Sequence, residues 1–253
     1  MPDLSHHHAV VTGGGTGIGA AIARDLLGAG ARVTIMGRRR EVLDACVASL
    51  PGLRAVPVDV TDEASVETAM AAAREAGPVT ILVNNAGAAE TAPLARTSTD
   101  LWQRMLAVNL TGTFLCTRAV LADVIAAPGG RIVNVASTSG LKGYAYTGAY
   151  AAAKHGVIGL TRTLALELAK TTATANAVCP GFADTDLVDR SLDNVMAKTG
   201  LSRADALQQF VRDNPQQRLV TPEEVAATVL WLCDPLSHSI NGQAIAVAGG
   251  EVM

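Results

Sequence analysis

The sequence predicts the α/β fold class, as a three-layer, doubly wound parallel sheet of seven strands with helices on both faces. Seven short apolar runs alternate with amphipathic helical stretches almost from end to end, which is typical of parallel strands joined by crossover helices. Hydrophobic residues make up 49% of the chain and aromatic residues 3%, which suits aliphatic strands covered by Ala-rich helices. No internal repeat or Pro/Ser-rich linker divides the 253 residues, so we expect a single domain over residues 1–253.

The expected strands are short runs rich in aliphatic and β-branched residues, and the expected helices have apolar residues at helical spacing. The strands are His8–Thr12, Arg32–Met36, Arg54–Val58, Thr80–Asn84, Arg131–Ala136, Thr174–Cys179 and Ala244–Val247. The helices are Ile18–Ala29, Arg39–Leu50, Asp62–Ala76, Ser98–Ala126, Gly148–Ala169 and Thr221–Cys233. Thr221-Pro222-Glu223-Glu224 illustrates a helix start, because a capping Thr precedes a Pro and two acids.

One long insertion, residues 182–215, interrupts this alternation after the sixth strand. It is polar and acidic, and its pattern is helical near Asn194–Val211. It follows the carboxyl edge of the sheet, where ligands bind in open α/β folds. Insertions of this length are uncommon without a function, so we expect a substrate lid; a solvated pair of surface helices is the alternative.

Composition and charge disfavour several functional classes. The net charge of −3 offers no basic surface for nucleic acid or an anionic membrane. The four cysteines are scattered without a CxxC pair, so neither structural zinc nor a disulfide framework is expected. His6, His7 and His8 are adjacent, and side chains that alternate between the faces of a strand cannot converge on one ion. We therefore expect no metal site.

The chain shows no sign of a targeting or membrane-spanning segment. Its N-terminus lacks the basic-then-apolar layout of a signal peptide, and no apolar run reaches the roughly 18 residues of a membrane span. A cytoplasmic protein that acts on a small molecule is the expectation.

A glycine-rich segment joins the first strand to the first helix. It reads Gly13-Gly14-Gly15-Thr16-Gly17-Ile18-Gly19. Glycines let the backbone turn sharply and approach a pyrophosphate, whose charge then lies at the helix N-terminus. Plain turns also use glycine, but the position between a strand and a helix favours a Rossmann-like dinucleotide site.

The end of the second strand indicates which dinucleotide is preferred. An acid there would bind the ribose 2′-OH of NAD, whereas this chain has Met36-Gly37-Arg38-Arg39-Arg40. A guanidinium can bind a 2′-phosphate with paired hydrogen bonds, so Arg38 and Arg39 favour NADP(H). NAD(H) or dual use stays open, because solvated arginines can also simply begin a helix.

A tyrosine and a lysine form the candidate catalytic pair. Tyr150 and Lys154 stand at i and i+4, on one face of a predicted helix. Ser137 ends the strand before that helix, at the carboxyl edge, so its hydroxyl and the phenol can meet one carbonyl oxygen. Hydride addition to a carbonyl builds an alkoxide, which a donor stabilises and an acid protonates. A nearby lysine charge is expected to lower the pKa of the phenol from about 10.

With these motifs the chain resembles the short-chain dehydrogenase/reductase family from about Ala9 to Gly250. The matching residues are Thr12-Gly13-x-x-x-Gly17-x-Gly19, Asp59-Val60, Asn84-Asn85-Ala86-Gly87, Asn109, Ser137, Tyr150-x-x-x-Lys154 and Pro180-Gly181-x-x-x-Thr185. Their order and spacing together are specific, and the resemblance implies a role for each group.

For the cofactor, the resemblance implies that Asp59 and Val60 border the adenine and that Asn85, Ala86 and Gly87 line the channel. It also implies a contribution from Pro180 and Gly181, with Thr185 holding the nicotinamide carboxamide. Asp59 can instead be a turn residue, and Asn84 is expected to be an internal tether between strands.

For the chemistry, the resemblance implies that Tyr150 is the general acid/base and that Lys154 binds the nicotinamide ribose and lowers the Tyr150 pKa. Ser137 would polarise the carbonyl, and Asn109 would support a water-mediated proton relay. The alternative for Asn109 is a mid-helix amide bonded only to backbone. The family is usually homotetrameric, with the Ser98–Ala126 and Gly148–Ala169 helices packed against a neighbour.

Within the family the chain looks most like 3-oxoacyl thioester reductases and 3-hydroxyacyl dehydrogenases. Carrier-protein reductases usually have a basic residue and a glycine before the sixth strand, where this chain has Lys170-Thr171-Thr172-Ala173. That departure weakens an acyl-carrier-protein partner and leaves coenzyme A thioesters or simple ketones and alcohols open. The alternatives are an NAD-dependent 3-hydroxyacyl-CoA or secondary-alcohol dehydrogenase and, more remotely, a non-catalytic nucleotide sensor.

Overall fold

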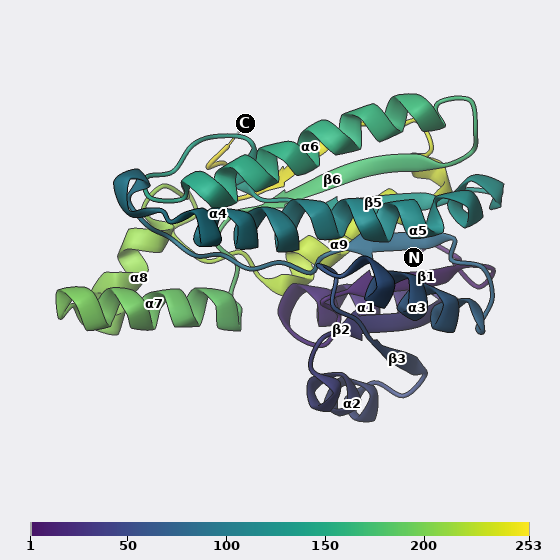
Figure 1. Cartoon of the computed structure of the whole chain (residues 1–253), viewed down its shortest axis with the longest axis horizontal. Helices are drawn as coiled ribbons and strands as arrows, with labels where there is room; N and C mark the ends of the chain where they lie inside the picture. The colour runs from purple at the N-terminus through teal and green to yellow at the C-terminus, as the bar shows by residue number, and fades with distance from the viewer. Residues whose placement is uncertain (1, 253) are drawn as a thin grey trace.

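The computed structural model describes residues 2–252 and confirms the predicted fold class (Figure 1). One parallel sheet runs in the order β3-β2-β1-β4-β5-β6-β7. Its strands are β1 His8–Thr12, β2 Arg32–Gly37, β3 Leu53–Pro57, β4 Ile81–Asn84, β5 Arg131–Val135, β6 Thr174–Pro180 and β7 Ala244–Val247. The strand order reverses between β1 and β4, and ligands of open α/β sheets bind beyond the carboxyl ends at such a point.

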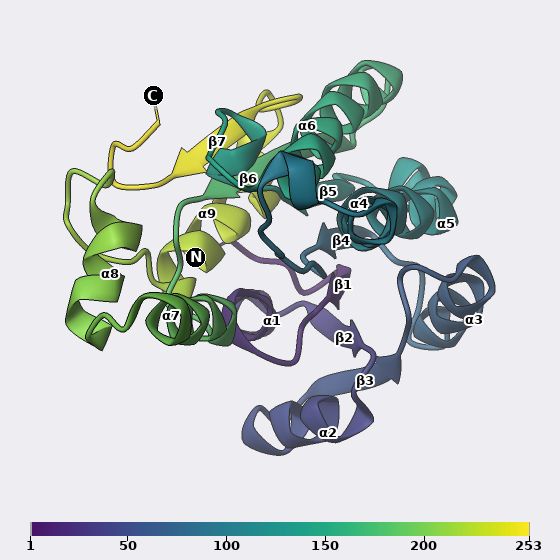
Figure 2. The same cartoon turned by 60° about the vertical axis from the view of Figure 1, so that its left-hand side comes forward.

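Helices cover both faces of this sheet, as Figure 2 shows with the sheet nearly edge-on. The helices are α1 Gly17–Gly28, α2 Arg40–Ser49, α3 Glu63–Arg74, α4 Thr99–Leu106, α5 Gly112–Ala126, α6 Gly148–Leu168, α7 Asp186–Thr199, α8 Arg203–Val211 and α9 Pro222–Cys233. Helices α1 and α9 lie on one face, and α3, α5 and α6 lie on the other.

Side-chain alternation along the strands produces two separate apolar cores. In β1, Val11 belongs to the cluster that contains Ile22 of α1, whereas its neighbour Val10 belongs to the cluster that contains Met70 of α3. Because successive strand residues point to opposite faces, a strand covered on both sides needs apolar residues throughout. All five residues of β1 are accordingly buried.

The predicted helix Ser98–Ala126 is divided into three parts. A π-helical turn, Ala107–Thr111, separates α4 from α5, and it contains Asn109. Contrary to the expectation from its sequence, the stretch Thr99–Ala126 is long and apolar enough to cross a membrane by length and composition alone, since 18 consecutive residues within it have a mean hydropathy of 1.4. Its α5 part buries Leu115, Cys116 and Val120 in the core beside the sheet, as a core helix does.

The insertion after β6 forms two helices, α7 and α8, so the single helical segment predicted near Asn194–Val211 is wrong in its extent. The break comes at Gly200, which ends α7 in the left-handed conformation with φ of 71°. Ser202 then caps α8 by accepting a hydrogen bond from the backbone N–H of Asp205. The helix pair projects from the body of the molecule on the side of the carboxyl ends (Figure 1).

Candidate active site

The glycine-rich loop between β1 and α1 can adopt its tight turn only because most of its residues lack side chains. Gly13 and Gly17 have φ of 64° and 51°, in the left-handed region that favours glycine. A Cβ at Gly19 would lie 2.2 Å from the carbonyl oxygen of Gly13. Within residues 2–252 no side chain caps α1, so the N–H groups of its first turn are available to an anion.

The end of β4 braces this loop. The Asn85 side-chain amide donates hydrogen bonds of 3.1 Å to the carbonyl oxygens of Thr12 and Gly13. The Thr12 hydroxyl accepts from the backbone N–H groups of Asn85 and Ala86, at 3.0 and 3.1 Å. The predicted residues Asn85 and Ala86 therefore adjoin the glycine loop at the point where the strand order reverses.

The ends of β2 and β3 place Arg38 near Asp59. Hydrogen bonds from Thr61 lower the pKa of Asp59, and the charge of Arg38 lowers it further. Arg40 is held by Asp44 at 2.8 Å, whereas no ion pair within the described part of the chain engages Arg38 or Arg39. Asp59 is thus a turn residue, as the alternative proposed, and it also lies in the corner where the 2′-phosphate is expected.

The beginning of the insertion 182–215 lies against the glycine loop. Thr185 immediately precedes α7, and a Cβ at Gly17 would lie 3.1 Å from the methyl carbon of Thr185. Pro180 is the last residue of β6, so Gly181 and Thr185 leave the sheet at its carboxyl edge. This arrangement brings Thr185 and the phosphate cradle together.

The candidate catalytic side chains meet where β5 ends beside α6. Ser137 forms a hydrogen bond to Tyr150 that lowers the pKa of the phenol. The Lys154 Nζ lies 5.7 Å from the centroid of the Tyr150 ring and donates a 2.8 Å hydrogen bond to the carbonyl oxygen of Val135. The three predicted groups therefore share one site.

Burial determines the electrostatics of this site. It raises the pKa of Tyr150 above its usual value, and the Ser137 hydrogen bond opposes that effect. This direction is opposite to the lowering expected from Lys154. Burial also lowers the pKa of Lys154 to about 8. A protonated phenol therefore faces a lysine that is still largely charged at neutral pH.

Asn109 is buried within the π-helical turn. Its side-chain oxygen accepts from the Ala88 N–H at 3.3 Å, and its side-chain nitrogen donates to the carbonyl oxygens of Ala88 and Met105 at 2.9 and 3.0 Å. These partners are all backbone groups, as the alternative for this residue proposed. A Cβ at Gly87 would lie 2.7 Å from Asn109 Oδ1 and 3.8 Å from Lys154 Nζ. Asn109 is thus near the site, while its proton-relay role stays a prediction.

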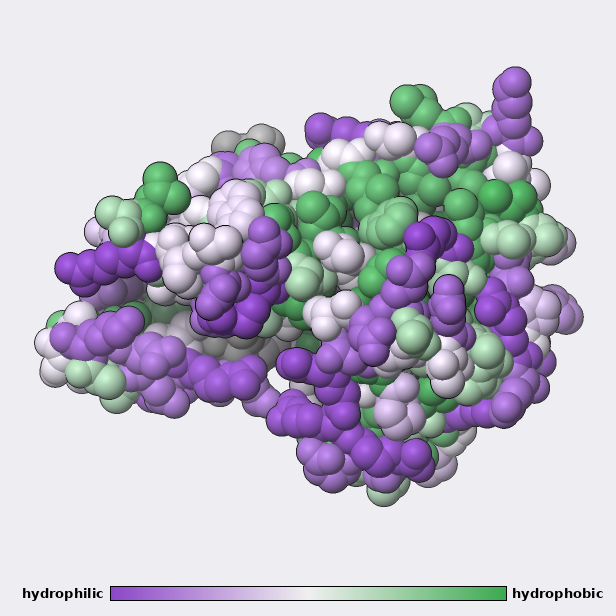
Figure 3. Space-filling model, viewed as in Figure 1, coloured by the Kyte–Doolittle hydropathy of each residue, from purple (hydrophilic) through white to green (hydrophobic). Residues whose placement is uncertain are grey.

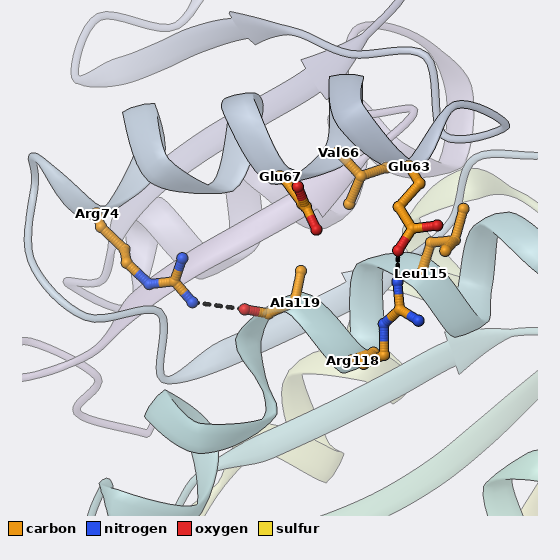
Figure 4. A pocket seen from close by; sticks show the side chains of 7 residues that line it. All are labelled: Glu63, Val66, Glu67, Arg74, Leu115, Arg118 and Ala119. Carbon is orange, nitrogen blue, oxygen red and sulfur yellow. Dashed lines mark hydrogen bonds and ion pairs between the residues drawn. The ribbon is translucent and has the colours of Figure 1, made fainter.

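A hollow of about 270 Å³ lies elsewhere, between α3 and α5 (Figure 4). Glu63 pairs with Arg118 across it, and Arg74 donates to the Ala119 carbonyl. None of the predicted site residues lines this hollow, so we do not assign the chemistry to it. Among residues 2–252 no group of three or more His, Cys, Asp or Glu is placed to hold a metal ion.

Sequence reasoning missed Glu251, which contacts the loop before α6. The Tyr144 hydroxyl forms a hydrogen bond to the Glu251 carboxylate, and Lys142 Nζ lies 3.2 Å from the same oxygen. These partners are separated by more than a hundred residues, and no motif links them. Asn84, by contrast, is an internal tether as expected, since its amide donates to Thr117 and Asn134.

The cradle, the paired Tyr150 and Lys154, and Ser137 together define an oxidoreductase that uses a nicotinamide dinucleotide. The family model described as short chain dehydrogenase matches residues 7–195. The chain therefore belongs to the short-chain dehydrogenase/reductase family.

Known relatives extend over almost the whole chain. A cis-4-hydroxycyclohexanecarboxylate dehydrogenase of Sinomonas cyclohexanicum is 42% identical over 248 residues, covering 96% of this chain and 95% of that protein. A 3-oxoacyl-[acyl-carrier-protein] reductase of Synechocystis sp. is 36% identical and covers 100% of both. The solved structure of a single-residue variant of actinorhodin polyketide ketoreductase with NADPH has a TM-score of 0.94 and 36% identity, over 99% of each chain.

These likenesses establish the reaction class. The protein is an NAD(P)-dependent oxidoreductase that acts on ketone and hydroxyl groups. The glycine cradle fits a dinucleotide, because Gly13 and Gly17 turn the loop with positive φ and the described side chains leave the N–H groups at the start of α1 uncapped.

Proposed function

We propose that the protein is an NADP(H)-dependent carbonyl reductase that interconverts a ketone and a secondary alcohol, with 3-oxoacyl thioesters as the leading substrate class. The observation that carries this proposal is the convergence of Ser137, Tyr150 and Lys154 at the carboxyl edge of β5. A hydroxyl, a phenol and an ammonium in one place supply what a developing alkoxide needs.

The bound dinucleotide supplies the hydride in reduction or accepts it in oxidation. Charge then develops on the substrate oxygen, to which the Ser137 hydroxyl donates a hydrogen bond. Tyr150 delivers the proton, and its raised pKa keeps the phenol protonated until that moment. The Lys154 charge stabilises the phenolate that remains. Asn109 holds the Ala88 backbone beside the site and is our candidate for returning the proton through water.

The preference for NADP(H) rests on Arg38 and Arg39. Both are exposed at the end of β2, next to the corner that contains Asp59. The relative of known structure that binds NADPH has the same fold over 99% of this chain, which supports this assignment. NAD(H) lacks the 2′-phosphate, so these arginines would add little to its binding.

A second substrate class, simple or cyclic secondary alcohols, is favoured by the lid. Residues 182–215 contain six Asp and four Arg or Lys, so the lid is acidic. A coenzyme A thioester would bring several phosphate charges to this acidic surface, whereas a cyclic alcohol, even one with a single carboxylate, brings fewer. The relative that acts on a hydroxycyclohexane carboxylate supports this second class.

We also propose a cytoplasmic homotetramer. Apolar side chains gather over α5 and α6 on the face seen in Figure 3. Among them Phe114 and Ile125 of α5 are 42% and 43% exposed, and Leu166 of α6 is 79% exposed. Large exposed apolar patches mark interfaces, so these helices are the surface on which copies would pack. The four cysteines are free, which fits a reducing compartment.

The test measures turnover of 3-oxoacyl thioesters, cyclic ketones and the matching alcohols. The absorbance of the reduced cofactor reports each reaction, and each ketone or thioester is tried with NADPH and with NADH. Tyr150→Phe should abolish reduction while NADPH still binds, because it removes only the acid. Turnover near the wild-type rate in that variant would refute the assignment. Tight cofactor binding with no turnover of any substrate would favour the nucleotide-sensor alternative.

A further inference from the structure

Glu251, two residues before the C-terminus, has a nearly buried carboxylate, with only 2% of its side chain exposed. It belongs to the tail that follows β7. Burying a carboxylate is unfavourable unless charged or hydrogen-bonding partners compensate. The residues that bond to this carboxylate therefore show which part of the protein the tail holds in place.

Both partners come from the loop that connects Ser137 to Tyr150. The Tyr144 hydroxyl and the Lys142 ammonium reach the same carboxylate oxygen. Lys142 Nζ also lies 4.8 Å from the centroid of the Tyr144 ring. The far end of the chain thus holds the loop between two of the candidate catalytic residues.

The single proton of the Tyr144 hydroxyl fixes the direction of the hydrogen bonds around it. An ionised carboxylate only accepts, so Tyr144 donates to Glu251. The 2.8 Å contact between Tyr144 and the Thr138 hydroxyl is then one in which Thr138 donates. Thr138 follows Ser137 directly, and the next N–H, from Ser139, donates to Ser137 Oγ at 3.1 Å. A connected series of bonds leads from Glu251 to the turn that carries Ser137.

The tail is fixed equally closely on the lid side. A Cβ at Gly249 would lie 2.3 Å from Asn214 Oδ1, and one at Gly250 would lie 3.3 Å from the Pro215 ring. Both glycines have positive φ, of 59° and 92°, which lets the tail turn there. Asn214 and Pro215 end the lid insertion, so the tail lies between the lid and the loop before α6. Figure 2 shows it leaving β7 toward the side of α8.

Tyr144 is also part of an aromatic cluster. Its ring centroid is 6.2 Å from that of Phe182, which in turn is 5.0 Å from Phe210 of α8. The chain has three Phe and three Tyr, and half of them meet here. The cluster lies at the carboxyl edge of the sheet, where substrates of open α/β folds bind, so we take it as the candidate wall of the substrate pocket.

We propose that Glu251 is a positioning residue for substrate: its carboxylate holds Tyr144 and Lys142 so that the aromatic wall and the Ser137 turn keep their places. The proposal rests on the function proposed above. The hydrogen bond and ion pair of the Glu251 side chain go to Tyr144 and Lys142 rather than to a predicted cofactor residue, although a Cβ at Gly181 would lie 3.2 Å from Glu251 Oε2. Its removal should therefore affect the substrate and leave the dinucleotide unaffected.

The experiment compares steady-state kinetics of five variants with wild type, one of which is the Glu251→Ala, Tyr144→Phe double variant. Glu251→Ala removes every bond, Glu251→Gln keeps an acceptor for Tyr144 without the charge for Lys142, and Tyr144→Phe removes the hydroxyl alone. Glu223→Gln, which alters an exposed acid paired with Arg24, is the control. NADPH affinity is measured by fluorescence titration, and melting temperature and oligomeric state are recorded for each.

We expect kcat/KM for the carbonyl substrate to fall about tenfold or more in Glu251→Ala, mainly through KM, as for loss of a hydrogen bond to a charged group. The loss of kcat/KM should be smaller in Glu251→Gln. The Glu251→Ala, Tyr144→Phe double variant should lose little more kcat/KM than the more damaging of its two single variants. NADPH affinity should stay within about twofold of wild type, because the cofactor contacts are unchanged.

Wild-type kcat and KM in folded Glu251→Ala would overturn the proposal, as would equal losses of substrate and NADPH affinity. If Glu251→Ala does not fold, Glu251→Gln and Tyr144→Phe decide by the same criteria. Absence of turnover in the wild type itself would refute the proposed function instead, so the two failures are distinguishable.

Discussion

The Lys154 ammonium donates a 2.8 Å hydrogen bond to the carbonyl oxygen of Val135, two residues before Ser137. This bond fixes the second turn of α6 against the end of β5. Gly140 completes the junction, because a Cβ there would lie 2.8 Å from the Lys154 carbonyl oxygen. The ammonium and the Ser137 hydroxyl consequently have a set separation before any substrate arrives, which is the pre-organisation that catalysis uses.

Replacing Lys154 should remove the positive charge beside Tyr150 and, with it, the pH dependence of kcat/KM. Lys154→Met is expected to lower kcat/KM about 100-fold, a typical contribution of acid–base machinery. The pKa of Lys154 is lowered to about 8, so the side chain is charged below that pH and neutral above it. Wild-type reduction should therefore decline as pH rises through about 8, since Tyr150 titrates higher. The variant should lack this decline in a pH profile of kcat/KM.

Gly19→Ala should damage both the fold and cofactor binding. The new Cβ would lie 2.2 Å from the Gly13 carbonyl oxygen, and moving that backbone atom aside is energetically unfavourable. A loss of about 1–3 kcal/mol in the free energy of unfolding is expected from such overpacking. Gly159→Ala is the matched control, because nothing lies within 4 Å of its Cβ, and it should stabilise α6 by about 0.5–1 kcal/mol. Urea denaturation measures the free energy of unfolding of both variants. Equal changes in the two would contradict the steric argument.

Arg38→Ala should weaken NADPH binding selectively. Loss of charge-assisted hydrogen bonds to the 2′-phosphate predicts a Kd that rises about 10–100-fold, whereas the Kd for NADH should hardly change. Arg40→Ala is the control, since Arg40 is already paired with Asp44. Calorimetric titration of each variant with NADPH and with NADH measures these dissociation constants. Unchanged NADPH affinity in Arg38→Ala would eliminate the proposed role.

His8 should make the protein sensitive to acid. Its ring nitrogens Nδ1 and Nε2 each lie 2.9 Å from an oxygen, that of the Gly77 carbonyl and that of the Thr34 hydroxyl, so a neutral ring can donate to the first and accept from the second. Burial lowers its pKa, with nearby Arg32 and Arg54 acting the same way. Below the unfolded value of about 6.5 the unfolded chain binds a proton that the native ring resists, so the free energy of unfolding must fall as pH falls.

The measurement for His8 is urea unfolding between about pH 5 and about pH 8, the window in which an ordinary histidine titrates. His8→Gln should be less stable at neutral pH but show a shallower decline toward acid. His155→Gln, which alters an exposed ring on α6, should retain the wild-type slope. A wild-type slope in His8→Gln would leave His7, whose pKa burial also lowers, as the source.

Local patterning sufficed to predict the sheet. Every predicted strand exists, with ends that differ by at most one residue, because strands covered on both faces need unbroken apolar runs. The lid was less predictable. Its helices pack on each other, so the break at Gly200 depends on a left-handed glycine that sequence alone does not distinguish from a helical one. The π-helical turn around Asn109 likewise has no sequence signature.

The site was predictable where one short segment carries it. Tyr150 and Lys154 lie on one helix, and the glycine loop is contiguous, so spacing alone brings these groups together. Contacts between distant segments were not predictable. The bond from Asn85 to the Gly13 carbonyl and that from Tyr144 to Glu251 join residues 72 and 107 positions apart. The direction of the Tyr150 pKa shift was wrong as well, because burial is a tertiary property.

The two lid helices bury Val188, Leu192 and Ala206 in a small cluster of their own, apart from the clusters that pack on the sheet. Such a unit can open and close while the sheet remains intact, because opening breaks few apolar contacts between the unit and the rest of the protein. Amide protons of α7 and α8 should then exchange with solvent faster than those of β1 or β4. If this unit acts as the proposed substrate lid, changes within the cluster should alter the rate of product release more than the melting temperature.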